Sequence, residues 1–187
     1  MAAPFGDPGY DPSAASRFLV NRGVGSGMIA PNDNTDAFNL PCYMASSGDT
    51  AGRFDGQTDS ARTSGKWLIF LIHTLTRTDA SWYAPVAVTD VTAAMSYGMA
   101  FGDVWMGTVA DVAAYWVGQK LLKVATPVAS GTDRTWTWQL PVGFPPGKYL
   151  RVQVDGGTLS QGGTPVEWDV HGYYEIALDA KSLTLSP

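Results

Sequence analysis

The stretch Trp67-Leu68-Ile69-Phe70-Leu71-Ile72-His73 decides the fold class. Its apolar residues are continuous and do not alternate with polar ones, as they would in a strand with one face in water. A continuous apolar run of this length is typical of a strand covered on both faces, which is the usual state of strands in parallel sheets. The stretch therefore predicts a buried parallel strand that ends at His73.

The segments around this strand predict βαβ units. Short apolar runs alternate with segments of helical period along residues 1–126, and this alternation is typical of an α/β fold with a parallel sheet. The pattern predicts helices over 11–22 and 89–98 and another from residue 109 onward. It predicts further short strands over 24–29 and 104–106.

The remainder of the chain, residues 127–187, predicts a small antiparallel β module. Serine, glycine and threonine become frequent here, and alternating runs are separated by turn sequences. The expected strands cover residues 136–140, 149–154, 166–170, 173–178 and 183–185. We accordingly expect two domains, 1–126 and 127–187.

Composition excludes several classes of protein. The chain has 187 residues, of which 45% are hydrophobic and 16% charged, so a folded core is expected. A net charge of -5 with scattered Lys and Arg argues against nucleic acid or a membrane surface as a partner. The longest apolar run is too short to span a bilayer, and residues 1–4 lack the basic and apolar regions expected of a signal peptide. The compartment, and whether Met1 is a natural start, stay open.

Residues 1–126 resemble the second half of the catalytic domain of the polysaccharide deacetylases. These metal-dependent carbohydrate esterases remove acetyl groups from chitin, peptidoglycan or acetylated xylan. The resemblance is carried by Ala3-Pro4-Phe5-Gly6, by the strand ending at His73, by the stretch Asp103 to Tyr115 and by the loop 32–40. It implies a partial (half) irregular (β/α) barrel of deacetylase type, followed by a C-terminal antiparallel β-sandwich-like module.

The resemblance also implies site residues. It makes the backbone N–H of Phe5 an oxyanion donor and His73 the general acid, and it suggests that Asp33 or Asp36 orients the imidazole. The position of His73 has independent support, because active sites of α/β folds gather at the carboxyl ends of parallel strands. The alternatives are a histidine that only ends a buried strand and aspartates that only cap turns.

The chain departs from the family at the metal site. The Thr-Phe-Asp-Asp-Gly and His-x-x-x-His motifs are absent, and the sequence holds two histidines in all, His73 and His171. His171 precedes a turn and is expected to be structural. One copy therefore cannot build the family's metal site. Since half a barrel exposes a sheet edge and apolar surface, we expect a homodimer or larger homo-oligomer. Two copies of His73 could then hold a divalent transition metal such as Zn.

The β module offers aromatic side chains for a polysaccharide. Trp136, Trp138 and Trp168 are the candidates, with core packing as the alternative for the first two. The sole cysteine, Cys42, is expected to be a buried structural thiol. The sequence thus predicts a truncated deacetylase-like hydrolase acting on acetyl bonds of a polysaccharide or small ester. The alternatives are a non-catalytic polysaccharide-binding remnant and one half of a split deacetylase.

Overall fold

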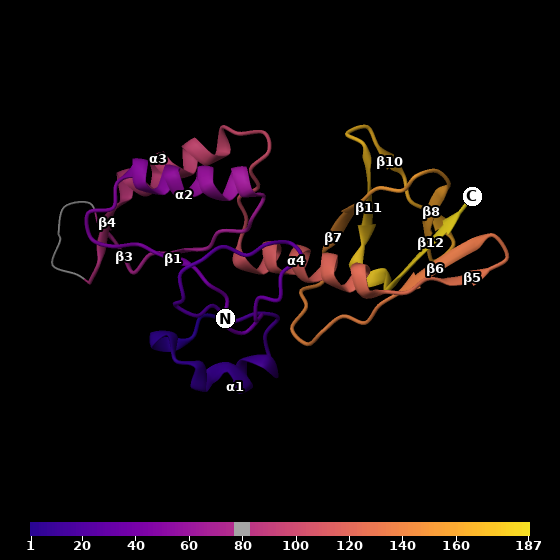
Figure 1. The fold of residues 1–187 in the computed structure, drawn as a ribbon, viewed down its shortest axis with the longest axis horizontal. Helices are drawn as coiled ribbons and strands as arrows, with labels where there is room; N and C mark the ends of the chain where they lie inside the picture. The colour runs from indigo at the N-terminus through magenta and orange to yellow at the C-terminus, as the bar shows by residue number, and fades with distance from the viewer. Residues whose placement is uncertain (77–82) are drawn as a thin grey trace. The chain divides into compact units, whose positions relative to one another are not determined.

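The computed structural model describes residues 1–76 and 83–187 (Figure 1). The chain forms two compact units: unit 1 comprises Met1–Ala15 and Val20–Val109, and unit 2 comprises Ser16–Leu19 and Ala110–Pro187. Both α and β structure are present, and no sheet formed by the described residues closes into a barrel. None of the helices in the described ranges has the length and apolar character needed to span a membrane.

Unit 1 contains two pairs of short parallel strands. Strand β1 (Tyr43–Met44) pairs with β2 (Phe70–Leu71), and β3 (Thr74–Thr76) pairs with β4 (Pro85–Ala87). The parallel direction agrees with the sequence-based expectation. Of the strand predicted over 67–72, only the two residues of β2 form a regular ladder of hydrogen bonds, and they form it with β1.

Isolated bridges extend the parallel arrangement toward the N-terminus. Arg22 forms parallel bridges with Ala2 on one side and with Leu40 on the other. In consequence, segments 1–3, 21–25, 40–45, 69–76 and 85–87 lie side by side in sequence order, each parallel to the one before. We call this run of segments the parallel array. The expected strand over 24–29 contributes only its first residues, since Ile29 instead forms an antiparallel bridge with Trp67.

Helices lie in two of the connections of the array and after its last segment. The first connection holds two 3-10 turns, η1 (Pro4–Gly6) and η2 (Pro8–Tyr10), and the short helix α1 (Asp11–Ala15). The helix predicted over 11–22 ends early, because residues 16–19 leave unit 1 and join unit 2. Helix α3 (Val88–Met99) confirms the helix expected over 89–98.

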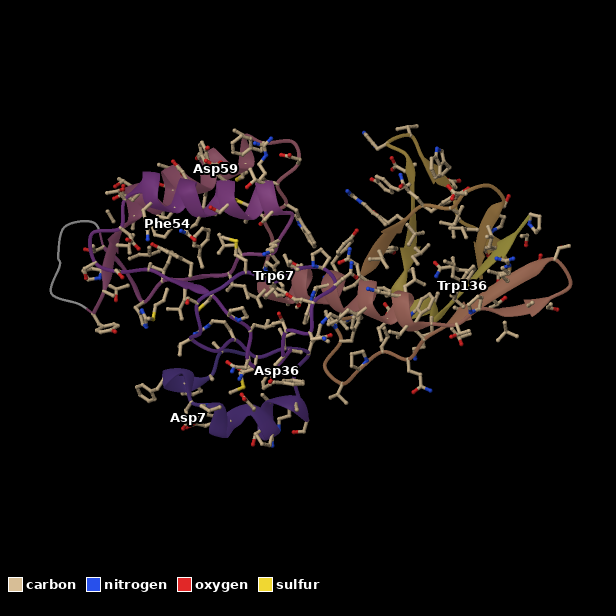
Figure 2. All side chains as sticks on the ribbon, in the orientation of Figure 1. Asp7, Asp36, Phe54, Asp59, Trp67 and Trp136 are labelled. Atoms are coloured by element: carbon tan, nitrogen blue, oxygen red, sulfur yellow. The ribbon has the colours of Figure 1, made fainter. Side chains whose placement is uncertain are left out.

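Helix α2 (Ala51–Ser64) connects β1 to β2 and was not predicted. It is polar nearly all round, and only Phe54 and Thr58 are buried. Figure 2 shows Phe54 on the side of α2 that faces the strands, and α2 packs beside α3. The helix starts where Ala51 N–H donates to the Asp90 carboxylate (2.9 Å), and it ends at Gly65, whose φ of 62° is left-handed.

The strand expected over 104–106 does not form. The segment between α3 and α4 (Val109–Val124) has no regular structure, and Trp105 is 57% exposed. An apolar run of three residues has no partner strand here and so gains no ladder of hydrogen bonds. The helix expected from residue 109 is confirmed as α4, and all of it after Val109 belongs to unit 2, whereas the expected domain boundary lay after residue 126.

Unit 2 joins α4 to two antiparallel sheets. One has the order β10-β11-β7 and the other the order β5-β6-β12-β8-β9. The bounds are β5 Val128–Ser130, β6 Asp133–Thr137, β7 Tyr149–Val152, β8 Thr158–Gln161, β9 Thr164–Pro165, β10 Trp168–Asp169, β11 Tyr173–Ala177 and β12 Ser182–Ser186, with a 3-10 turn η3 at Leu178–Ala180. The antiparallel arrangement of this region is as expected.

The core of unit 2 lies between these layers. It consists of Trp138, Leu150, Leu159, Ile176, Leu178 and Leu183. Apolar side chains of α4, including Leu121 and Leu122, pack against it. The alternation along β7 and β11 therefore points one face of the three-stranded sheet inward and leaves the other face in water.

Candidate functional site

Two candidate residues of unit 1 lie in or beside segments of the parallel array. Phe5 lies in the turn just after the first segment, and His73 lies within the fourth segment, between β2 and β3.

The turn at Phe5 is strained. Gly6 N–H donates to the Ala3 carbonyl (3.0 Å) and Asp7 N–H donates to the Pro4 carbonyl (3.1 Å). Between them Phe5 has a φ of 54°, which is left-handed and costly for a residue with a side chain. Its ring is fully exposed, and its N–H donates no hydrogen bond within the described residues. The turn therefore presents a backbone donor to solvent.

His73 is exposed and has no carboxylate partner in the described part of the chain. Its ring packs edge-on against the ring of Tyr83, with centroids 4.9 Å apart. Residues 77–82, which follow β3, lie outside the described residues. The imidazole is consequently open to a ligand or substrate from solvent.

Asp33 and Asp36 bind backbone groups of their own loop. The Asp33 carboxylate accepts from Ala30 N–H (2.7 Å) and from Thr35 N–H (3.1 Å), and Asp36 accepts from Phe38 N–H (2.9 Å). These contacts match the turn-capping alternative. The structure does not bring either carboxylate into hydrogen-bond contact with His73.

The position of this loop explains the separation. At its start Ile29 pairs with Trp67, which precedes the fourth segment, and at its end the Ala37 carbonyl accepts from Asn21 N–H at the start of the second segment. Both contacts lie at amino ends of segments in the array. His73 lies further along the fourth segment, between β2 and β3, and not at its amino end.

In the ranges 1–76 and 83–187, no group of three or more His, Cys, Asp or Glu side chains is placed so that it could hold a metal.

A polar cluster beside β1 was missed by sequence reasoning. The Tyr43 hydroxyl donates to the Asp49 carboxylate (2.8 Å) and accepts from Arg53 Nε (3.2 Å). Burial and the bond to Asp49 raise the pKa of Tyr43, so the phenol stays protonated near neutral pH. The three residues come from β1, its following loop and α2, which no short motif marks. Their contacts hold β1 to α2.

A cleft of about 300 Å³ opens between residues 24–28, β1 and α2. Val24, Met28 and Met44 give it an apolar lining, and Gln57 supplies a polar group. Neither Phe5 nor His73 lines it. The cleft is thus separate from the candidate catalytic groups.

The three candidate tryptophans of unit 2 do not form one surface. Trp138 is only 7% exposed, and its indole N–H donates to the Leu178 carbonyl (2.9 Å), so it belongs to the core. Trp136 is half-buried in β6, which Figure 2 shows in the five-stranded sheet. Trp168 is 52% exposed but lies in the other sheet, edge-on to Tyr174.

Cys42 provides a test of the packing of unit 1. The thiol is buried, its Sγ–H donates to the Gly23 carbonyl (3.6 Å), and burial raises its pKa. Both effects keep the reactive thiolate scarce and inaccessible.

We expect a thiol-reactive dye to label native Cys42 at least about a hundredfold more slowly than it labels the urea-unfolded chain. Equal rates in the two states would contradict the burial of this side chain.

Comparison of the chain with known protein families, with curated proteins and with solved structures finds no match.

Proposed function

We propose that unit 1 supplies part of the catalytic site of a deacetylase-like hydrolase that cleaves acetyl ester or amide bonds of a polysaccharide or a small ester. The observation that carries the proposal is the turn at Phe5. It is a strained turn with an exposed ring and an N–H that bonds to no described residue, and it follows the first segment of a parallel array whose fourth segment carries His73 between β2 and β3. Strain of this kind clusters at functional sites.

The parallel array supports the half-barrel part of the proposal. In a (β/α) barrel each strand lies beside the preceding one in the chain, with connecting helices between them. The array has this order, and α2 connects β1 to β2. Among the described strands β4 pairs with β3 alone, which leaves its other side open for further strands.

The proposed chemistry uses two groups of this chain. The Phe5 N–H donates to the oxygen that becomes negative when water attacks the acetyl carbonyl. The attacking water loses its proton to solvent, and His73 donates a proton to the leaving alcohol or amine as the bond to the acyl carbon breaks. Because His73 makes no hydrogen bond to a described residue, its imidazole is open to approach by the leaving group.

The second part of the proposal is assembly. Val24, Met44 and Leu75 belong to segments of the array or follow one directly, yet they are exposed. Burying apolar surface of this kind contributes on the order of 25 cal/mol per Å². We therefore assign unit 1 a role in a homodimer or larger homo-oligomer. A divalent transition metal such as Zn held between copies would have His73 as one ligand, and this role is the alternative to that of the acid.

The test is hydrolysis of a chromogenic acetate by the full chain. His73→Ala is expected to lower kcat/KM about a hundredfold, which is the usual contribution of a general acid. The matched control is His171→Ala, which removes the other imidazole and is expected to stay within about twofold of the parent. Absence of hydrolysis by the parent chain, or full activity in His73→Ala, would overturn the proposal.

Metal content and mass in solution test the assembly. Light scattering should show a dimer or a larger oligomer. Metal analysis should find about one Zn for each pair of chains. Loss of the metal in His73→Ala would identify His73 as a ligand. Retention of the metal with loss of activity would identify it as the acid. A metal-free monomer that still hydrolyses the acetate would refute the assembly while leaving the hydrolase in place.

A further inference from the structure

The parallel array has an irregular step between its second segment, 21–25, and its third, 40–45. Leu40 N–H donates to the Asn21 carbonyl (3.0 Å), and two residues later Cys42 N–H donates to the Gly25 carbonyl (2.8 Å). A regular parallel ladder advances equally on both strands, whereas Gly25 comes four residues after Asn21. The second segment therefore bulges by two residues. Bulges are frequent next to functional sites.

The second segment leaves the array at this bulge. Beyond it, residues 26–28 lead to Ile29, which pairs with Trp67 and not with the third segment. The departing chain passes close to the third segment, since a Cβ at Gly27 would lie 3.3 Å from the Pro41 Cβ. The place beside β1 that a continued second segment would fill is thus left open. Residues of both segments line the cleft of about 300 Å³.

Main-chain groups of β1 are unpaired on this side. The N–H groups of Tyr43 and Ala45 donate to carbonyls of the fourth segment (2.8 and 2.9 Å). Because these groups alternate in direction along a strand, the N–H and C=O of Met44 point away from β2, toward the second segment. Neither group of Met44 has a hydrogen-bond partner within the described residues. Met44 therefore offers one donor and one acceptor to an incoming backbone.

The lining of the cleft is mainly apolar. Val24 and Met44 are 43% and 46% exposed, and together with Met28 they offer apolar side chains, two of them flexible thioethers. Burial raises the pKa of the Tyr43 hydroxyl and of the Cys42 thiol, so neither is ionised near neutral pH. The other lining residues are also uncharged: Ser26, Gly27 and Gln57.

Charged side chains contact residues of this lining or their neighbours from outside the cleft. Arg53 and Asp49 both bond to the Tyr43 hydroxyl (3.2 and 2.8 Å), and Arg22 donates to the Gly23 carbonyl (2.7 Å). None of these three charged side chains lines the cleft. A charged ligand group would lose water there without gaining an ionic partner, which disfavours it.

We propose that the cleft binds an extended, uncharged apolar peptide segment, which takes the place beside β1 that the second segment leaves. The peptide runs parallel to β1. The carbonyl before one of its residues accepts from the Met44 N–H, and the N–H after that residue donates to the Met44 carbonyl. Main-chain bonds of this kind give affinity in strand addition, and the pocket for the side chain gives selectivity.

The size of the cleft limits what it can take. Its volume is at the lower end of the range of ligand pockets, so it suits a single apolar side chain with the peptide groups on either side. The side chain enters between Val24, Met28 and Met44. This site does not depend on the hydrolase proposed for unit 1, because neither Phe5 nor His73 lines the cleft.

The test is titration of the full chain with a blocked leucine, N-acetyl-leucine N-methylamide, followed by the methionine methyl resonances. Those of Met28 and Met44 should shift, and those of Met95 and Met99, exposed on α3, should not. We expect a dissociation constant of about 1 mM for a ligand of this size. Met44→Ala, followed at Met28, should weaken binding about fivefold. The matched control is Met95→Ala, which should stay within about twofold.

Ligand analogues test the parts of the proposal without altering the protein. N-acetyl-leucine methyl ester lacks the N–H that the Met44 carbonyl accepts, and it should bind about fivefold more weakly. Blocked glutamate and blocked lysine should also bind more weakly than blocked leucine. Unchanged methyl shifts of Met28 and Met44, equal affinity for the ester, or a preference for a charged analogue would overturn the proposal. So would shifts of these methyls with protein concentration alone, which would assign the cleft to a second copy of the chain.

Discussion

Ile176→Ala is expected to lower the free energy of unfolding of unit 2 by about 3 kcal/mol. The side chain is fully buried at the centre of β11 and is a member of the core cluster of unit 2. Truncation removes buried methyl and methylene groups and leaves a cavity that the two sheets and α4 cannot fill without moving. Urea unfolding followed by hydrogen exchange of the β7 and β11 amides measures the loss.

Glu175→Ala is the matched control for this change. It alters the preceding residue of the same strand, which points to the opposite, exposed face. We expect it to change the free energy of unfolding by less than about 0.5 kcal/mol. Equal losses in the two variants would show that the inward and outward faces of β11 have been assigned wrongly.

Phe54→Ala is expected to have a similar effect on unit 1, about 4 kcal/mol. Phe54 is the buried anchor of α2, and its ring meets those of Tyr43 and Phe70 edge-on with centroids 6.1 and 5.4 Å away. These contacts join α2 to both strands of the first parallel pair. Their loss removes apolar burial and two favourable ring contacts together.

The rate of Cys42 labelling in increasing urea reports this effect, because the thiol becomes reactive only when unit 1 opens. Ser60→Ala is the control, since Ser60 is exposed on the same helix and its hydroxyl donates only to the Gly56 carbonyl. A loss in Phe54→Ala no larger than in Ser60→Ala would refute the assignment of Phe54 as the anchor. The Cys42 readout should be insensitive to Ile176→Ala if the units unfold separately.

Elements with a regular apolar period were predictable from sequence. Helices α3 and α4 bury small residues on one stripe, and the 3.6-residue period marks them. The strands β7, β11 and β12 alternate and are bounded by turn sequences, so their approximate positions were also predicted. In these elements burial against the rest of the unit imposes the pattern.

Elements that bury little were not predictable. Helix α2 has two buried residues in four turns, and its polar sequence resembles a loop. Its start depends on Asp90, a residue 39 positions away, so no local motif reveals it. Conversely, the apolar run over 104–106 suggested a strand, although a strand exists only where a second segment offers hydrogen bonds.

The candidate site shows the same division between local and distant information. His73 could be proposed because it ends a recognisable apolar run, and Phe5 because the turn Ala3-Pro4-Phe5-Gly6 resembles a motif of the deacetylases. The partners of Asp33 and Asp36 could not be predicted. The position of their loop depends on pairing between segments that are distant in the sequence.

The path of the chain between the two units limits how the protein can be dissected. The polypeptide passes from unit 1 to unit 2 after Ala15, returns after Leu19, and passes over again after Val109. A single proteolytic cut after Val109 therefore leaves Ser16–Leu19, which belongs to unit 2, covalently joined to the fragment that contains unit 1. The short piece would act as a tether, and the two products of such a cut should co-purify until a denaturant releases them.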